Sequence, residues 1–159
     1  QTVEKLSLYK RDDSSDLTVE DIEACAPRST EAALDDVLNV VAEGRAGEIG
    51  PLIRRLQAQG TNGVTLCIGA MRHFRTLYAC ASDPGGAAQG IGKLRPPVYG
   101  KRRDRILRQA QGWGAAKLQT ALTVLTDTDL ALRSAGQTAP AMARVERAMI
   151  RLAMLARSR

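Results

Sequence analysis

Apolar residues recur at intervals of three and four along most of this chain, which is the period of an amphipathic helix. No stretch has the sustained alternation of β-branched residues that marks a half-buried strand. The pattern therefore predicts an all-α protein. About six helices in a single bundle account for residues 29–159.

The first two helices of this bundle are predicted to form a short antiparallel hairpin. Their apolar faces begin near Leu34 and Ile49, and Gly44 and Gly60 stand where the helices should end. A third helix, over about residues 61–80, has a wide apolar surface that implies a central, largely buried position. Its predicted inward stripe is Val64, Cys67, Ile68, Met71, Phe74 and Tyr78, with Leu66, Ala70 and Leu77 beside it.

The second half of the bundle begins with a glycine-rich segment, residues 82–92, whose composition predicts a loop. A proline elbow at Pro96 and Pro97 then leads into a basic helix, and a long apolar helix follows as far as Gly136. Thr138 and Pro140 are expected to open the last helix. Its predicted inward residues are Met142, Val145, Met149, Leu152 and Ala156.

The first 28 residues form a separate, acidic unit in this interpretation. Thr18 is a helix cap, and Leu17 and Ile22 have the spacing of a hydrophobic staple. The unit is too small to fold alone, so we predict a domain boundary between residues 1–28 and residues 29–159. Because the chain opens with what looks like the end of a helix, we expect that a further N-terminal part precedes it.

The net charge of +6 conceals an asymmetry along the chain. Residues 1–50 carry 5 Lys/Arg and 12 Asp/Glu, which is a net charge of −7, whereas residues 51–159 carry 18 and 5, which is +13. The basic part suits nucleic acid or acidic protein partners, and a solvated face is the alternative.

Cysteine usage and hydropathy indicate the cellular compartment. Cys25, Cys67 and Cys80 form no CxxC pair and lie among apolar residues, as reduced, buried thiols do. No apolar run approaches the roughly 20 residues that a membrane span requires. We therefore predict a soluble, cytoplasmic protein with no membrane contact.

The sequence contains no complete signature of catalysis, cofactor binding or metal binding. The segment GGAAQGIGKL imitates a phosphate-binding loop, but Ala87 replaces its first glycine and Leu94 replaces the Ser/Thr that binds magnesium. His73 has no second ligand at metal-binding spacing. Asp127 and Asp129 point to different faces of one helix and cannot easily share a proton. We predict no catalytic, cofactor-binding or metal-binding residue, and no cofactor.

The most informative feature is a basic cluster between Lys93 and Arg108, which contains seven cations and one acid, Asp104. Cations neutralise phosphates, and a tyrosine at the elbow can stack on an unpaired base. Single-stranded or junction DNA is therefore a candidate partner, and protein contact and plain solvation remain alternatives. The candidate DNA-proximal residues are Tyr99, Lys101, Arg102 and Arg103.

Two further groups of polar residues are candidates for contact with another subunit. Asp129 and Arg133 have the i, i+4 spacing of a helix salt bridge. Arg144, Arg147 and Arg151 form a basic stripe along one side of the last helix. Such a stripe is suited to an acidic neighbour, although exposure to solvent explains it equally well.

These pieces together resemble one protein family. EKLSLY followed by TVEDIEA is similar to the end of the lid domain in delta subunits of the bacterial DNA polymerase III clamp loader. LRPPVYGKRR, then a tryptophan, LQTALTVLTDTDLALRSAG and ERAMIRLA, resembles the collar domain of the same family. The likeness spans nearly the whole chain. Arg133 stands where many relatives have lysine, which keeps the charge and changes the hydrogen-bond geometry.

The resemblance implies a non-catalytic scaffold subunit of the DNA polymerase III holoenzyme. In such proteins the helical C-terminal domain joins the tau/gamma and delta prime subunits in a ring-shaped collar. The sliding clamp would be bound only through an N-terminal domain outside this chain, and primer–template DNA is a candidate partner. Residues 1–28 would then be the remnant of the AAA+ lid domain.

Two other hypotheses about the function remain open. An independent helical DNA-binding protein could use the basic segment 93–108, although the proline elbow fits a helix-turn-helix poorly. A helical enzyme is the third reading, and it lacks a convergent acid, base or nucleophile.

Overall fold

The computed structural model describes residues 29–134, 136 and 138–158, and within them it contains helices and no strand. The helices are α3 (Thr30–Ala42), α4 (Ala46–Ala58), α5 (Gly63–Ala81), α6 (Ala87–Gly92), α7 (Gly100–Arg133) and α8 (Ala141–Arg157). The predicted all-α fold class is confirmed. Residues 1–28, with the helix predicted in them, lie outside the described residues, so the domain boundary stays a prediction.

Helices α3 and α4 form the predicted hairpin, whose turn depends on Gly44. The side chain of Ser29 caps α3 by accepting a hydrogen bond from the Ala32 amide at 3.2 Å. At the other end of the helix Gly44 has a φ of 74°, and a Cβ built there would lie 2.7 Å from Cγ of Arg157. A left-handed backbone with so little space requires glycine. The chain reverses here, and both helices pack against α8.

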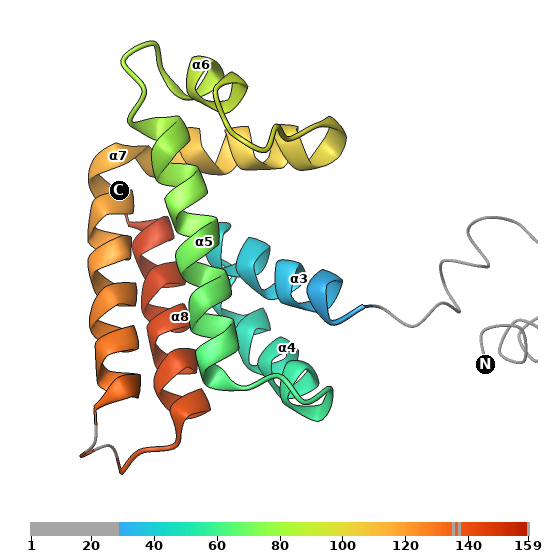
Figure 1. The fold of residues 1–159 in the computed structure, drawn as a ribbon, viewed down its shortest axis with the longest axis vertical. Coiled ribbons are helices and arrows are strands. Elements are labelled where there is room, and N and C mark those ends of the chain that lie inside the picture. Colours follow the sequence, from blue (N-terminus) through green and yellow to red (C-terminus); the bar gives the residue numbers. More distant parts are fainter. Residues whose placement is uncertain (1–28, 135, 137, 159) are drawn as a thin grey trace, which may run out of the picture.

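Helix α5 lies at the centre of the fold, as its wide apolar surface predicts. It packs against α3, α6, α7 and α8, and Figure 1 shows it in green between the C-terminal helices and α3. Its buried apolar side chains are Leu66, Cys67, Ala70, Phe74, Leu77 and Cys80.

The predicted inward stripe of α5 is wrong at two positions. Val64 and Ile68 are 38% and 46% exposed. The line that was expected beside the stripe, which contains Leu66, Ala70 and Leu77, is fully buried instead. The apolar surface of α5 is wider than the area that its neighbours cover, and the uncovered edge holds these two residues.

The loop predicted over residues 82–92 contains a short helix, α6, so that prediction is wrong in its second half. Gly90 faces α5 there, and a Cβ on it would lie 2.4 Å from the carbonyl oxygen of Cys80. Ile91 is 2% exposed and joins the core. Gly90, one of the glycines that indicated a loop, therefore allows two helices to approach each other closely.

Helix α7 turns sharply in its middle, which separates the predicted basic helix from the predicted apolar helix. The break lies at Gly114, whose φ of 71° and ψ of 159° are not helical. We call residues 100–113 the first arm and residues 115–133 the second arm. Figure 1 shows the first arm crossing the top of the molecule and the second arm descending beside α8.

Trp113 lies directly before this break and anchors the corner. Its ring meets Phe74 edge to face at 5.1 Å between centroids, and its Nε1 donates a hydrogen bond to the carbonyl oxygen of Ala42 at 2.8 Å. A buried tryptophan usually satisfies its single donor in this way. The corner of α7 is thereby tied to both α5 and α3.

Helix α8 closes the bundle with the predicted inward face. Met142, Val145, Met149 and Leu152 are buried, and Ala156 is partly buried. The thiols of Cys67 and Cys80 are free and buried, as predicted, and Cys25 lies outside the described residues. No helix in the described part of the chain has the length and apolar character of a membrane span.

Candidate interaction surfaces

The four predicted DNA-proximal residues gather at the start of the first arm. Tyr99 is the N-cap of α7 and is 76% exposed. Lys101, Arg102 and Arg103 occupy the first turn of the helix, which contains no acidic residue. The positive end of the helix dipole adds to these charges rather than offsetting them. The result is an exposed, positively charged helix end beside an exposed tyrosine.

Helix α3 neutralises one side of this basic arm. Arg105 Nε lies 2.7 Å from Oε1 of Glu43, and Arg102 Nη1 lies 3.7 Å from Oδ2 of Asp35. Both acids come from the acidic half of the chain, so its opposite charges meet in space. Within the described residues Lys101 and Arg103 make no ion pair, so the predicted basic cluster divides into paired and unpaired cations.

Glu43 and Gln109 form the polar centre of this contact. Burial alone would raise the pKa of Glu43, but hydrogen bonds from Arg105, Gln109 and Arg45 outweigh it and hold the pKa below its usual value. Gln109 is 5% exposed and donates hydrogen bonds from Nε2 to Oδ1 of Asn39 at 2.9 Å and to Glu43 at 3.2 Å. The basic arm is thus fixed in orientation by directional bonds.

His73 belongs to the same polar centre and is partly buried, as an edge-of-core residue is. Its Nε2 lies 2.9 Å from Oε1 of Gln109, so the ring donates to the amide oxygen. Burial lowers the pKa of His73 and outweighs the opposite effect of this hydrogen bond. The imidazole is therefore neutral at pH 7, and its hydrogen bond orders Gln109. Among the described residues no group of three His, Cys, Asp or Glu side chains is arranged to hold a metal ion.

In the segment that imitates a phosphate-binding loop, the adjacent carboxylate of Asp83 binds two of the groups that a phosphate would need. Asp83 accepts a hydrogen bond from the Gly85 amide at 2.9 Å and pairs with Lys93 Nζ at 2.6 Å. These bonds hold the pKa of Asp83 below its usual value. The lysine and a backbone amide that a phosphate would need therefore serve to order the turn before α6.

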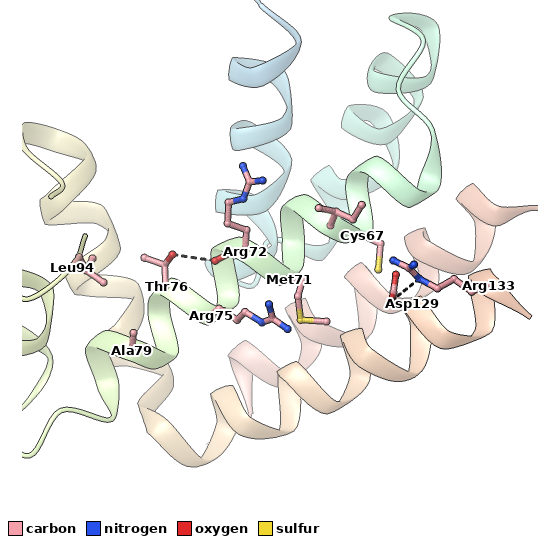
Figure 2. A pocket seen from close by; sticks show the side chains of 10 residues that line it. Cys67, Met71, Arg72, Arg75, Thr76, Ala79, Leu94, Asp129 and Arg133 are labelled. Atoms are coloured by element: carbon pink, nitrogen blue, oxygen red, sulfur yellow. Dashed lines mark hydrogen bonds and ion pairs between the residues drawn. The ribbon is translucent and has the colours of Figure 1, made fainter. Parts of the chain in front are cut away.

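A second surface is a groove of about 550 Å³ between α5 and the second arm of α7, and the sequence predicted only Asp129 and Arg133 of its lining as contact residues. Its lining residues are Cys67, Ile68, Met71, Arg72, Arg75, Thr76, Ala79, Leu94, Asp129 and Arg133. Figure 2 shows Met71 and Arg75 pointing from α5 toward the second arm, with Leu94 at the end near α6. The signal that was available in the sequence is the excess width of the apolar surface of α5.

The predicted pair Asp129 and Arg133 lies at one end of this groove. Arg133 Nε is 2.9 Å from Oδ2 of Asp129, so the expected i, i+4 ion pair is present (Figure 2). Nearby, the Sγ of Cys67 lies 3.9 Å from the Leu125 carbonyl oxygen. Burial raises the pKa of this thiol, which is therefore protonated and packs as a small apolar group. The groove thus has an apolar floor and charged edges.

The arginine stripe on α8 lines another groove, of about 310 Å³, against the second arm of α7. Arg147 and Arg151 are exposed, whereas Arg144 is partly buried and its Nε has no hydrogen-bond partner. Asp127 is the acidic residue in the lining of this groove. The three arginines therefore share one surface, which is separate from the surface of the Asp129–Arg133 pair.

Comparison of the sequence with protein-family models and with curated proteins returns no significant match. Among solved structures, the chain is similar to the DNA clamp loader delta protein (YqeN) of Bacillus subtilis, with a TM-score of 0.70 and 17% sequence identity. The similarity covers 96% of this chain and 44% of that protein, so the chain spans less than half of its length. This likeness shows that the chain has a clamp-loader-like fold.

Proposed function

We propose that this chain is the C-terminal part of a clamp-loader subunit related to delta, and that it holds neighbouring subunits together in the collar. The observation that carries the proposal is the fold shared with a clamp loader delta protein over 96% of the chain. The resemblance of the LRPPVYGKRR and TDTDLALR segments to the collar domain supports the same assignment. Residues 29–159 would form the collar domain, and residues 1–28 would be the end of the lid domain.

The proposed partners are the tau/gamma and delta prime subunits, and the chain itself would contribute no catalytic step. The candidate contact residues lie on two surfaces, the Asp129–Arg133 pair and the α8 stripe of Arg144, Arg147 and Arg151. Side chains of this kind suit acidic or polar faces of neighbouring subunits. The sliding clamp would be bound by an N-terminal part outside this chain.

Assembly is tested by co-expressing the chain with the tau/gamma and delta prime subunits of its source organism and following it by size-exclusion chromatography. The proposal expects co-elution. The double variant Arg147→Glu, Arg151→Glu should weaken co-elution. An equal charge change on exposed residues of α4, Arg54→Glu with Arg55→Glu, is the matched control. Elution of the unmodified chain apart from both subunits would contradict the proposed function.

We further propose that the start of the first arm approaches primer–template DNA. Tyr99 is exposed for stacking on an unpaired base. Lys101 is exposed and Arg103 is partly buried, and neither makes an ion pair within the described residues, which suits contact with phosphates. Arg102 is partly engaged by Asp35 at 3.7 Å and should contribute less than the exposed, unpaired Lys101. This difference in pairing supports unequal contributions from residues that the sequence treated as equivalent.

Fluorescence anisotropy with a primer–template junction at low salt tests this contact. The quadruple variant Tyr99→Ala, Lys101→Ala, Arg102→Ala, Arg103→Ala should bind more weakly, and each lost phosphate contact should reduce the salt slope by about 0.7–0.9. Arg54→Ala with Arg55→Ala controls for charge loss elsewhere. Equal affinity of the quadruple variant and the unmodified chain would remove the DNA contact. Tight binding that persists at physiological salt would favour an independent DNA-binding protein instead.

A further inference from the structure

The outer edge of α5 carries side chains at the spacing that helices use to pack along one another. Val64, Ile68, Met71 and Arg75 follow at intervals of four, three and four residues. This is the interval of a helix–helix seam, and repetition places such residues on one face. Val64 and Ile68 are the two large apolar residues of α5 that remain substantially exposed. The face therefore has the pattern of a seam with its partner missing from the described part of the chain.

The groove beside this edge has the dimensions of a helix-binding site. Its lining extends along α5 from Cys67 to Ala79, which corresponds to about 18 Å, or a little over three helical turns. The second arm of α7 forms the opposite wall, and Leu94 closes one end (Figure 2). Amphipathic helices bind such grooves by placing apolar residues at intervals of three and four on the floor.

The charges around the groove indicate the charge that a partner should carry. Arg72 and Arg75 are exposed and make no ion pair within the described residues. Arg133 is paired with Asp129, the one acidic residue of the lining. The groove is therefore positive overall, whereas the cations of the first arm are partly neutralised by α3. A complementary ligand would present carboxylates beside its apolar residues.

We propose that this groove receives an acidic amphipathic helix of about three turns from a partner protein. The proposal deepens the assembly role above, and it rests on that role only for the expectation that the partner is a neighbouring subunit. Apolar residues of the partner contact Ile68 and Met71, and its carboxylates lie opposite Arg72 and Arg75. The seam on α5 then becomes buried from Val64 to Ala79.

A synthetic peptide provides a direct test. It contains about 14 residues, with leucines at heptad a and d positions and glutamates flanking them, and it carries a fluorescent label. Its matched control has lysine in place of every glutamate. Anisotropy with the full chain should show binding of the glutamate peptide, with weaker or no binding of the lysine peptide. Backbone amide shifts measured by NMR should change along α5 between residues 64 and 79.

Variants of the chain separate this groove from the other positive surfaces. Arg72→Glu with Arg75→Glu should lower the affinity for the glutamate peptide at least about tenfold, and Ile68→Asp should lower it by a similar factor. Arg54→Glu with Arg55→Glu changes the charge equally on α4, away from the candidate contact residues, and should leave the affinity unchanged. Helical circular dichroism equal to that of the unmodified chain confirms that each variant is folded.

Several outcomes would overturn the inference. These are equal binding of both peptides, amide shifts confined to the first arm or to α8, and no binding up to about 1 mM peptide. A concentration-dependent dimer that Ile68→Asp dissociates would assign the groove to a second copy of this chain and would also overturn it. Failure of the inference is distinguishable from failure of the proposed function. If the groove variants still co-elute with the other loader subunits, the proposed function is supported and the proposed helix-binding site is contradicted.

Discussion

The two arms of α7 on either side of Gly114 contact the rest of the molecule in different ways. The first arm combines apolar packing of Ile106 and Ala110 with directional bonds. In these bonds Trp113 donates to the Ala42 carbonyl and Arg105 pairs with Glu43. The second arm is held by apolar packing around Leu118 and Leu125, which are fully buried. Directional bonds fix the orientation of the arm that carries the basic surface, and apolar burial fixes the arm that forms one wall of the groove.

This comparison is tested most strongly at Trp113. Trp113→Ala should lower the free energy of unfolding by about 3–5 kcal/mol because a large buried side chain is lost. Trp113→Phe keeps most of the volume and leaves the Ala42 carbonyl without its donor, which should cost about 1–3 kcal/mol. Urea denaturation followed by circular dichroism measures both. An equal loss in the two variants would mean that the hydrogen bond, rather than the packing, dominates the corner.

The corner itself is tested by two glycines of the same helix. Gly114→Ala should destabilise the protein by about 1–3 kcal/mol, because its φ of 71° with ψ of 159° is adopted almost only by glycine. Gly112→Ala is the matched control. A Cβ at either position meets no atom within 4 Å, and Gly112 lies inside the helix at a φ that is not left-handed. Its replacement should therefore stabilise the protein by roughly 0.5–1 kcal/mol. Equal effects in thermal unfolding would contradict the assigned break.

The bonds of the first arm should make its stability dependent on pH. The pKa of Glu43 is lowered in the folded protein, so the ionised form stabilises the fold above the unfolded-state value near 4.5. This contribution is lost as the pH falls through the lower folded-state pKa. Because Glu43 is partly exposed, the loss should be about 1 kcal/mol or less. Glu43→Gln should flatten this part of the pH profile of unfolding, and an unchanged profile would contradict the assignment.

The smallest effect is expected at the exposed ion pair of the second arm. Asp129→Asn removes a pair between partly exposed side chains and should change the free energy of unfolding by about 0.3–0.5 kcal/mol. Arg133→Gln should give the same value, since either change removes the same interaction. A loss above about 1 kcal/mol in either variant would show that the second arm also depends on directional bonds.

The helices and their inward faces were largely predictable from the sequence. The hairpin of α3 and α4, with Gly44 at its turn, follows from local spacing and from the special backbone of glycine. The inner face of α8 was predicted in the same way. At α5 the same reasoning identified a buried helix but misplaced Val64 and Ile68, because periodicity gives the width of an apolar surface and does not give how much of it the neighbours cover.

Among the candidate sites, a contact within one helix was predictable and contacts between distant segments were not. The ion pair of Asp129 and Arg133 follows from a spacing of four on one helix and was predicted correctly. The pairing of Arg102 with Asp35 and of Arg105 with Glu43 joins residues more than 60 positions apart. No local pattern encodes such a contact. For this reason the sequence presented seven cations as one cluster, and the folded chain divides them into paired and unpaired groups.

The sequence by itself determined that this protein is helical, where most of its helices begin and end, and that acidic and basic halves are joined in one chain. Those properties arise from hydrogen bonds and side-chain spacing within a few residues of each other. The tertiary structure decided which apolar residues stay exposed, which cations are neutralised, and where α7 turns its two arms apart. These depend on which helices lie side by side, because apolar surface is buried by packing between helices and not within any one segment.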